Sequence, residues 1–399
     1  MVWVNQDKCA IVGIGSTDYY VRGKSWPRTI SDMAGEAILN ACADAGISIR
    51  QIDGIAYYSG AGAGYLDKFD TASLMETLGI PHVGFSATLT SGGGGCPGAI
   101  GLATAGLMNE DCTYVVTLMA LQQLPQHRLG VVFGASAPNP ENSFLQPSGL
   151  VGPGHLMSVL ARRHMHLYGT RTEAFREIVM ATRANTHNRP KAIRKAPLTA
   201  EEYDASPMLA DPLRRLDFCL ETDGAVAVIT TTMDRARDCR HKPAIVHGVA
   251  HGGTREWGRA FAWMGMPDPD FASSGHKFVA DRIWEQTGLS ASDMDVALIY
   301  DHFSCMVLMQ LEDYGFCAKG EGSDYVLSGA IRHGGSGIAV NTHGGNLSEA
   351  YIIGMTHIVE GVEQVRGTAI NQVEDAEFAL VTGGPASLPV SGMILRRAA

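Results

Sequence analysis

The residues with the clearest chemical potential form a glycine-rich loop in the first quarter of the chain. The loop reads Ser91-Gly-Gly-Gly-Gly-Cys96 and runs into a stretch of small and apolar residues that predicts a helix. Glycines at the start of a helix leave their backbone N–H groups unshielded, so the four glycines are suited to an oxyanion hole. The same loop also fits a tight turn that serves packing alone.

Cys96 follows these glycines directly and is a candidate nucleophile, because a helix N-terminus lowers the pKa of a thiol. The proline at position 97 favours instead a buried structural thiol. The other cysteines are scattered without a C-x-x-C pair, which argues against a zinc ribbon or a disulfide framework and fits a reducing compartment. The histidines show no helical metal spacing, so no metal site is predicted.

Strand and helix patterns alternate along the chain. An apolar run over 9–15 predicts a buried strand, apolar residues at helical spacing predict a helix over 29–45, and a strand is predicted over 52–58. Strands that alternate with helices predict an α/β protein whose mixed or parallel sheets are covered by helices.

This unit occurs twice, which indicates an internal duplication. Residues 45–58 align with 287–300 at a constant offset, and a looser match joins 91–119 with 341–382. Both members of the looser match are read as loop, helix and strand. We therefore predict two similar halves, 1–240 and 241–399, with an insertion over about 120–215 that lies over an active site.

The composition is that of a globular enzyme with a large core. Of the 399 residues, 45% are hydrophobic and 18% are charged, and the formal net charge is −10. Without a general basic field to recruit polyanions, a nucleic-acid or anionic-membrane role is disfavoured. The N-terminus lacks the apolar core of a signal peptide, and no apolar run is long enough to span a bilayer. We predict a cytoplasmic protein with no membrane span.

Four collinear stretches carry a family resemblance: Ala10-Ile-Val-Gly-Ile-Gly-Ser-Thr-Asp-Tyr-Tyr20, Asp211-Pro-Leu-Arg-Arg-Leu-Asp-Phe-Cys219, Thr222-Asp-Gly-Ala-Val-Ala-Val228 and Val340-Asn-Thr-His-Gly-Gly345. They resemble the thiolase superfamily and, within it, the lipid-transfer-protein (sterol-carrier-protein-like) branch. The resemblance implies a duplicated five-layered αβαβα fold and a homodimer. It also implies a CoA thioester in a tunnel that leads to a site between the two halves.

At the catalytic positions of that family this chain carries different residues. The thiolase nucleophile aligns with Gly93, because Ala99 and Ala103 keep the spacing of the small residues that follow it. The two family histidines align with Tyr300, in Tyr300-Asp-His-Phe-Ser304, and with Tyr351, in Ala350-Tyr-Ile-Ile-Gly354. The second family cysteine is replaced in Thr382-Gly-Gly-Pro385. These departures argue against chemistry through an acyl-cysteine.

Tyrosines at both histidine positions resemble the steroid side-chain aldolases, which cleave a β-hydroxyacyl-CoA of a sterol or bile acid by a retro-aldol reaction. That reaction needs a base, an acid and donors for the thioester oxygen, and a phenol both donates and accepts hydrogen bonds. Ionising an ordinary phenol at neutral pH costs roughly 4 kcal/mol, so neighbouring groups must help. The predicted site therefore comprises Tyr300 and Tyr351 as base and acid in either order, their neighbours Asp301, His302 and His343, and Gly93, Gly94 and Gly95 at the thioester oxygen.

The predicted insertion carries a basic helical stretch, in which Arg194 and Lys195 are predicted to contact the phosphates of CoA. A basic stretch also fits a solvated helix face. The aldolase resemblance implies a partner subunit with an OB fold and a zinc ribbon, in a dimer of heterodimers, and no cofactor in this chain besides the CoA thioester substrate. Two alternatives stay open at this point: a thiolase-like acyl-CoA acyltransferase, and a non-catalytic acyl-CoA or lipid-binding scaffold subunit.

Overall fold

The computed structural model of the chain describes residues 3–59, 65–66, 71–90, 92–123, 146–253, 272–384 and 389–399. Two half-sheets form its centre. The N-terminal half-sheet has the strand order β1 (Cys9–Ser16), β9 (Thr222–Thr232), β6 (Tyr114–Gln123), β3 (Gly54–Ser59) and β5 (Phe85–Thr90). The C-terminal half-sheet has the order β10 (Ala244–Gly252), β14 (Val390–Arg397), β13 (Phe378–Gly383), β11 (Val296–Leu298) and β12 (Ala339–Val340).

The two half-sheets are built in the same way. In each, the first three strands of this order are antiparallel neighbours and the last three are parallel neighbours. A short antiparallel pairing of β1 with β10 joins them at one edge. This equivalence matches the predicted internal duplication. The predicted division at 240/241 falls between α8 (Met233–Ala236) and β10 and stays a prediction.

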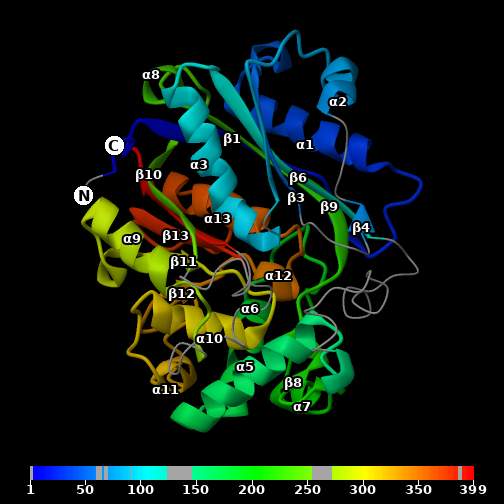
Figure 1. The fold of residues 1–399 in the computed structure, drawn as a ribbon, viewed down its shortest axis with the longest axis vertical. Coiled ribbons are helices and arrows are strands. Elements are labelled where there is room, and N and C mark those ends of the chain that lie inside the picture. The colour runs from blue at the N-terminus through cyan, green and yellow to red at the C-terminus, as the bar shows by residue number, and fades with distance from the viewer. Residues whose placement is uncertain are drawn as a thin grey trace.

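Helices separate and cover the half-sheets in five layers. Helix α1 (Ile30–Ala45) packs on β1, β9 and β6, and α9 (Lys277–Thr287) packs on β10 and β14. Helices α3 (Gly95–Met108) and α13 (Met355–Arg366) each contact strands of both half-sheets, so they form the middle layer (Figure 1). The predicted helix over 29–45 is confirmed, with Thr29 as its N-cap in a capping box with Asp32.

A group of helices covers one end of the molecule. They include α5 (Pro153–Tyr168), α6 (Thr172–Ala184) and α7 (Ala200–Asp204) of the predicted insertion, which lie near α10 (Ser304–Asp313), α11 (Gly322–Leu327) and α12 (Gly345–Ser348) in the lower half of Figure 1. Residues 124–145 of that insertion lie outside the described residues. The smaller elements are β2 (Tyr20–Val21), β4 (Tyr65–Leu66), β7 (Met208–Ala210), β8 (Leu213–Arg214) and α2 (Thr71–Leu78).

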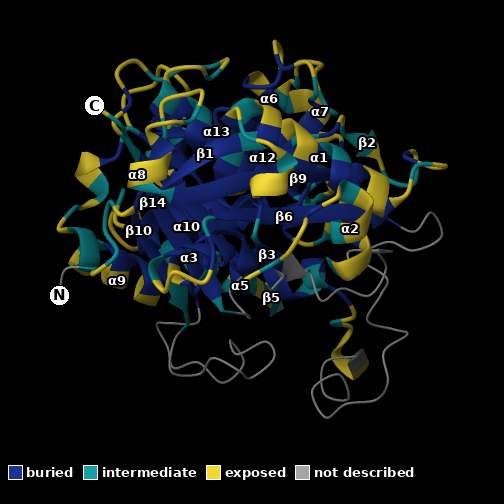
Figure 2. Ribbon diagram, turned by 90° about the horizontal axis from the view of Figure 1, so that it is seen from above, coloured by how far each residue is buried: buried dark blue, intermediate teal, exposed yellow. Residues whose placement is uncertain are grey.

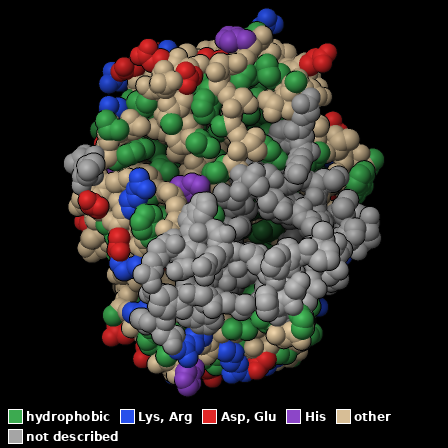
Figure 3. Space-filling view, viewed as in Figure 1, with side chains coloured by type: hydrophobic (Ala, Val, Ile, Leu, Met, Phe, Trp, Pro, Cys, Tyr) green, Lys and Arg blue, Asp and Glu red, His purple; other side chains and the backbone are tan. Residues whose placement is uncertain are grey.

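Burial follows this layering. The strands and the middle helices are buried, while the exposed residues lie on the outer helices and loops (Figure 2). On the face seen in Figure 3, acidic and basic side chains of the described residues are interspersed. Among the described residues, no helix is both long and apolar enough to cross a membrane.

Candidate active site

Tyr300 stands at the carboxyl end of the parallel strands of the C-terminal half-sheet, two residues after β11. A closed ring of hydrogen bonds fixes its backbone. The Tyr300 N–H donates to Thr382 Oγ1 (2.9 Å), the Thr382 hydroxyl donates to Gln310 Oε1 (2.6 Å), and the Gln310 amide donates to Tyr300 O (2.8 Å). Since all three residues are buried, the position of the phenol is set before any ligand binds.

Tyr351 lies in the loop between α12 and α13 and is held in a similar way. Its N–H donates to Thr222 Oγ1 and its carbonyl accepts from the same hydroxyl, both at 2.9 Å. The two phenol oxygens, Tyr300 Oη and Tyr351 Oη, are 3.4 Å apart. Burial raises the pKa of Tyr351, while the hydrogen bond from Tyr300 opposes that rise. The structure thus brings together the two tyrosines that are 51 residues apart in the chain.

Gly93 lies directly against Tyr300. A Cβ on Gly93 would stand 2.3 Å from both Cζ and Oη of Tyr300, which no side chain tolerates. The phenol therefore fills the volume that a side chain at position 93 would need. Gly92–Gly94 form a 3-10 turn that leads into α3 at Gly95, and the Ser391 hydroxyl donates to Gly94 O at 2.7 Å. The Tyr300 hydroxyl consequently sits beside the N-terminal end of a 14-residue helix, where the helix dipole favours negative charge.

His302 is the histidine next to the phenols. Its ring centroid lies 5.1 Å from that of Tyr300, and neither ring nitrogen has a hydrogen-bond partner within the described part of the chain. Burial, with a smaller contribution from His276, lowers the pKa of His302 to about 3. The imidazole is therefore neutral at physiological pH and offers one donor and one acceptor.

Asp301 and His343 are close in sequence to the tyrosines but face other partners. Asp301 Oδ1 and Oδ2 accept from the backbone N–H groups of Asn346 (2.8 Å) and Leu347 (3.2 Å), and Oδ1 lies 3.1 Å from His357 Nε2. His343 packs edge-on against His357, with ring centroids 4.7 Å apart, and its ring nitrogens make no hydrogen bond to either tyrosine or to any other described residue. Asp301 and His343 both contact His357. The ring of His357 in turn stacks on Tyr300, with ring centroids 6.2 Å apart, so it links these two residues to the phenol.

Cys96 lies in the first turn of α3 and is fully buried. It belongs to the same apolar core cluster as Tyr300 and Tyr351. This placement fits the structural role that the following proline favoured.

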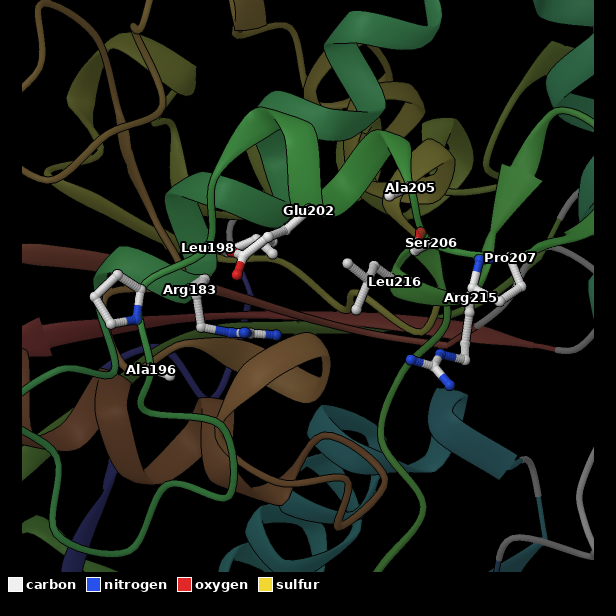
Figure 4. Close-up of a pocket in the computed structure, with 10 residues that line it drawn as sticks. Arg183, Ala196, Leu198, Glu202, Ala205, Ser206, Pro207, Arg215 and Leu216 are labelled. Carbon is white, nitrogen blue, oxygen red and sulfur yellow. The ribbon is translucent and has the colours of Figure 1, made fainter.

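An arginine-lined pocket of about 470 Å³ opens near α6 and α7 (Figure 4). In Figure 4 the guanidinium groups of Arg183 and Arg215 extend toward one another, with Glu202 also at the wall. Arg194 lies close enough that its charge, after burial, helps to lower the pKa of Arg183 to about 10. Arg183 Nη2 and Arg194 Nη1 are buried and have no hydrogen-bond partner among the described residues. Guanidinium groups with free N–H donors are suited to bind an anion.

The two predicted CoA-contacting residues differ in their surroundings. Arg194 belongs to this arginine cluster, and its backbone N–H donates to Ser348 O in α12 at 3.1 Å. Lys195 is exposed and donates to Pro190 O at 2.5 Å.

Sequence reasoning missed several residues around the site: Thr222, Gln310, Thr382, His357, Arg183 and Arg215. Thr222 stands in one of the stretches that carry the family resemblance, and Thr382 begins the stretch in which the second family cysteine is replaced, so both positions were a signal. Gln310, His357 and Arg183 are buried polar residues on helices, and nothing in a single sequence separates them from ordinary packing.

Comparison with known proteins places the chain in a family. Residues 263–395 match the thiolase C-terminal domain-like family. The 17-hydroxy-3-oxo-4-pregnene-20-carboxyl-CoA lyase of Mycobacterium tuberculosis is 36% identical, over 97% of this chain and 99% of the relative. The steroid side-chain-cleaving aldolase of Thermomonospora curvata is 34% identical, over 97% of each chain. The chain belongs to the thiolase superfamily.

Solved structures agree with this assignment. The Ltp2-ChsH2(DUF35) aldolase aligns over 99% of both chains with a TM-score of 0.89 and 33% identity. An acetyl-CoA acetyltransferase from Syntrophomonas wolfei, at 14% identity and a TM-score of 0.67, shares the fold. The predicted thiolase fold is confirmed. Within the superfamily the chain groups with the side-chain-cleaving aldolases, and it is a carbon–carbon lyase that acts on an acyl-CoA.

Proposed function

We propose that the substrate is a β-hydroxyacyl-CoA with a steroid or bile-acid side chain, and that Tyr300 and Tyr351 carry out the retro-aldol cleavage. The relatives that cover almost the whole chain are named for steroid side-chain cleavage and for a pregnene carboxyl-CoA. The reaction converts the β-hydroxyl into a ketone or aldehyde and releases a shorter acyl-CoA. Because no net oxidation occurs, the reaction requires no redox cofactor.

The observation that carries the proposal is the pair of buried phenol oxygens 3.4 Å apart. One phenol oxygen accepts the proton of the β-hydroxyl as the bond between the α and β carbons breaks, and the same phenol passes its own proton to the second phenol oxygen, 3.4 Å away. The other phenol gives a proton to the α carbon of the resulting enolate. One proton leaves the substrate and one returns, so transfer between the two hydroxyls restores the starting state.

The glycine turn stabilises the negative charge that forms on the thioester oxygen, a role that the two phenols do not take. Its backbone at Gly93, Gly94 and Gly95 and the N-terminal end of α3 favour the negative charge that develops on the thioester oxygen. The same helix end favours negative charge on the oxygen of Tyr300. Proton transfer that is concerted with bond cleavage avoids a free phenolate.

The three neighbouring side chains take different roles in this proposal. Neutral His302 donates one hydrogen bond to the substrate oxygen or to Tyr300, since both of its nitrogens are free. Asp301 holds the first turn of α12, and through it the Tyr351 loop. His343 acts only through His357, against which it packs.

The phosphates of CoA occupy the arginine pocket in this proposal, held by Arg183, Arg194 and Arg215. The Arg183 Nε–H donates to Ser348 Oγ at 3.1 Å, and Ser348 precedes Tyr351 by three residues, so the pocket adjoins the loop that carries a phenol. Lys195 lies at the exposed rim and adds long-range attraction.

The test is direct. The purified protein is incubated with a 17-hydroxy-steroid-20-carboxyl-CoA or a 24-hydroxylated bile-acyl-CoA, and products are followed by mass spectrometry. A steroid ketone or aldehyde together with the matching shorter acyl-CoA or acyl product supports the proposal. Full activity of an Arg183→Gln/Arg215→Gln variant at low substrate concentration would remove the arginine pocket from it.

We also propose a homodimer that binds a DUF35 partner in the cytoplasm. The similar aldolase structure is named for Ltp2 together with ChsH2(DUF35). Strand β5 is the edge of the described sheet, which leaves its outer side open to a second copy. All eight cysteines are unpaired, as a reducing compartment favours. Light scattering of the chain with and without an OB-fold/zinc-ribbon partner measures both stoichiometries.

A further inference from the structure

Arg189 lies in a buried cluster that surrounds the loop of Tyr351. Its Nε is 2.7 Å from Glu349 Oε1, its Nη1 is 2.9 Å from Glu360 Oε2, and its Nη2 is 3.9 Å from Glu363 Oε2. Glu349 precedes Tyr351 by two residues, and Glu360 lies in α13, which follows it. The Arg189 guanidinium therefore forms ion pairs with residues on both sides of Tyr351 in the chain.

The loop between these two contacts is unusual in its backbone. Ile353 has φ 46° and Gly354 has φ 86°, both in the left-handed region, which is strained for isoleucine. Such a conformation persists only where surrounding contacts determine it. Backbone pairing adds to the contacts of Arg189, because Ile193 N–H donates to Glu349 O at 2.9 Å.

We propose that Arg189 is a positioning residue for the cleavage: by holding Glu349 and Glu360 it fixes the Tyr351 loop, and so sets the distance between the two phenols. This inference rests on the proposed function, since it assigns Arg189 a part in the same reaction. Arg189 lies on the segment between α6 and Arg194. Its contacts with Glu349 and Glu360 therefore also connect the arginine-lined pocket with the Tyr351 loop.

The carboxylates around Arg189 make its contacts dependent on pH. Three carboxylates face a single arginine, and the other titratable groups nearby are Tyr19, the neutral His343, and His357. The Glu360 carboxylate is satisfied further by the hydroxyl of Thr342 (2.6 Å) and the amide of Gln364 (3.0 Å). Burial and the neighbouring Glu360 raise the pKa of Glu363 to about 8, and burial raises that of Glu349 to about 7.

The consequence is a competition for Arg189. At neutral pH the Glu363 carboxyl still carries its proton, and Arg189 pairs with Glu349. As the pH rises through about 8, Glu363 ionises and draws the guanidinium toward itself. Glu349, whose pKa is about 7, is also charged by then, so the two carboxylates share the guanidinium and the contact that holds the Tyr351 loop changes.

The experiment places 3-fluorotyrosine at position 351 and follows its fluorine resonance between pH 6 and 9 without substrate. The expected result is a shift with a midpoint near pH 8 in the otherwise native protein and in the control Glu374→Gln, which removes an exposed carboxylate. In Glu363→Gln the shift is lost. A resonance that does not move in the native protein, or that moves identically in Glu363→Gln, overturns the proposal.

Kinetics supply the second readout. Arg189→Lys keeps the charge but loses the fork, so we expect kcat to fall about tenfold while KM for the acyl-CoA stays within about twofold. Arg189→Met with Glu349→Gln removes both charges of one pair, and we expect the same displaced resonance. An unchanged kcat in Arg189→Lys contradicts the proposal. If the native protein cleaves no steroid acyl-CoA, the proposed function fails, whereas the fluorine experiment still decides the role of Arg189.

Discussion

Helices α3 and α13 occupy equivalent places in the two halves, but the loops that lead into them have opposite character. The turn before α3 is Gly92–Gly94, which offers backbone alone. The loop before α13 includes Ala350 to Gly354 and presents the phenol of Tyr351, with Glu349 held on one side and Glu360 on the other. In the proposed reaction, the first half thus provides backbone groups for the developing charge, and the second half provides the two phenols.

The same division holds for the rest of the site. Tyr300, His302, Asp301 and His343 all come from the C-terminal half, and Tyr300 projects into the space left at Gly93. The phenol of Tyr300 thus fills the volume that a side chain at position 93 would need, so the position of Tyr300 requires glycine at position 93.

The largest expected effect comes from removing the phenol hydroxyls of the C-terminal half. Tyr300→Phe and Tyr351→Phe should each lower kcat for cleavage by about 10²–10⁴-fold, because each removes a proton donor and acceptor while it keeps the ring. Product formation measured by mass spectrometry gives the rates. The control is Tyr325→Phe, which removes the hydroxyl of a tyrosine outside the site. If both site variants keep native rates, the two-phenol mechanism is wrong.

The bare surface of the N-terminal half is tested by Gly93→Ala. The added methyl group meets the phenol of Tyr300, so we expect loss of about 1–3 kcal/mol in the free energy of unfolding and strongly reduced cleavage. Denaturation in urea measures the first effect. In a Tyr300→Ala background the same substitution should cost almost nothing. Gly35→Ala on α1, where the new atom makes only ordinary contact, serves as the control.

A smaller effect is expected from acid, which destabilises the C-terminal half through its buried neutral histidine His302. His302 has a pKa of about 3 in the folded state, below its ordinary value of 6.5, so the unfolded chain binds the extra proton. Its contribution to stability is complete above pH 6.5 and is lost as the pH falls toward 3. By pH 5 the loss amounts to about 2 kcal/mol. His302→Gln should therefore lose less stability between pH 7 and 5, and parallel urea midpoints would contradict this assignment.

The smallest effect is expected at the two threonines that fix the phenols. Thr382→Val opens the hydrogen-bond ring at Tyr300, and Thr222→Val releases the backbone of Tyr351. Each leaves a buried N–H without a partner, which costs about 1–3 kcal/mol of stability, and we expect kcat to fall roughly tenfold. Thermal unfolding and cleavage rates check both values. Thr231→Val, whose hydroxyl bonds Thr113 O far from the phenols, should lower stability without changing kcat.

Much of the fold follows from the sequence because local patterns determine it. The alternation of strands and helices and the repeat of 45–58 at 287–300 predicted the two equivalent half-sheets. The helix over 29–45 was predictable from its spacing, and its boundary from the capping residue Thr29.

The site was predictable only in part, for physical reasons. The contact of Gly93 with Tyr300 joins residues on different halves, and no local pattern encodes it. Asp301 neighbours Tyr300 in sequence, but successive side chains of an extended segment point in opposite directions, so it meets α12 instead. His343 was expected beside the phenols, whereas the fold places His357 between them. The arginine pocket is formed by residues from separate loops.

The close fit of Tyr300 against Gly93 also has an evolutionary consequence. A thiolase-like cysteine at position 93 and a phenol at position 300 compete for one volume, so a chain with both would be sterically blocked. A single substitution of either residue therefore cannot convert this site into one with a cysteine at position 93, and both positions have to change together.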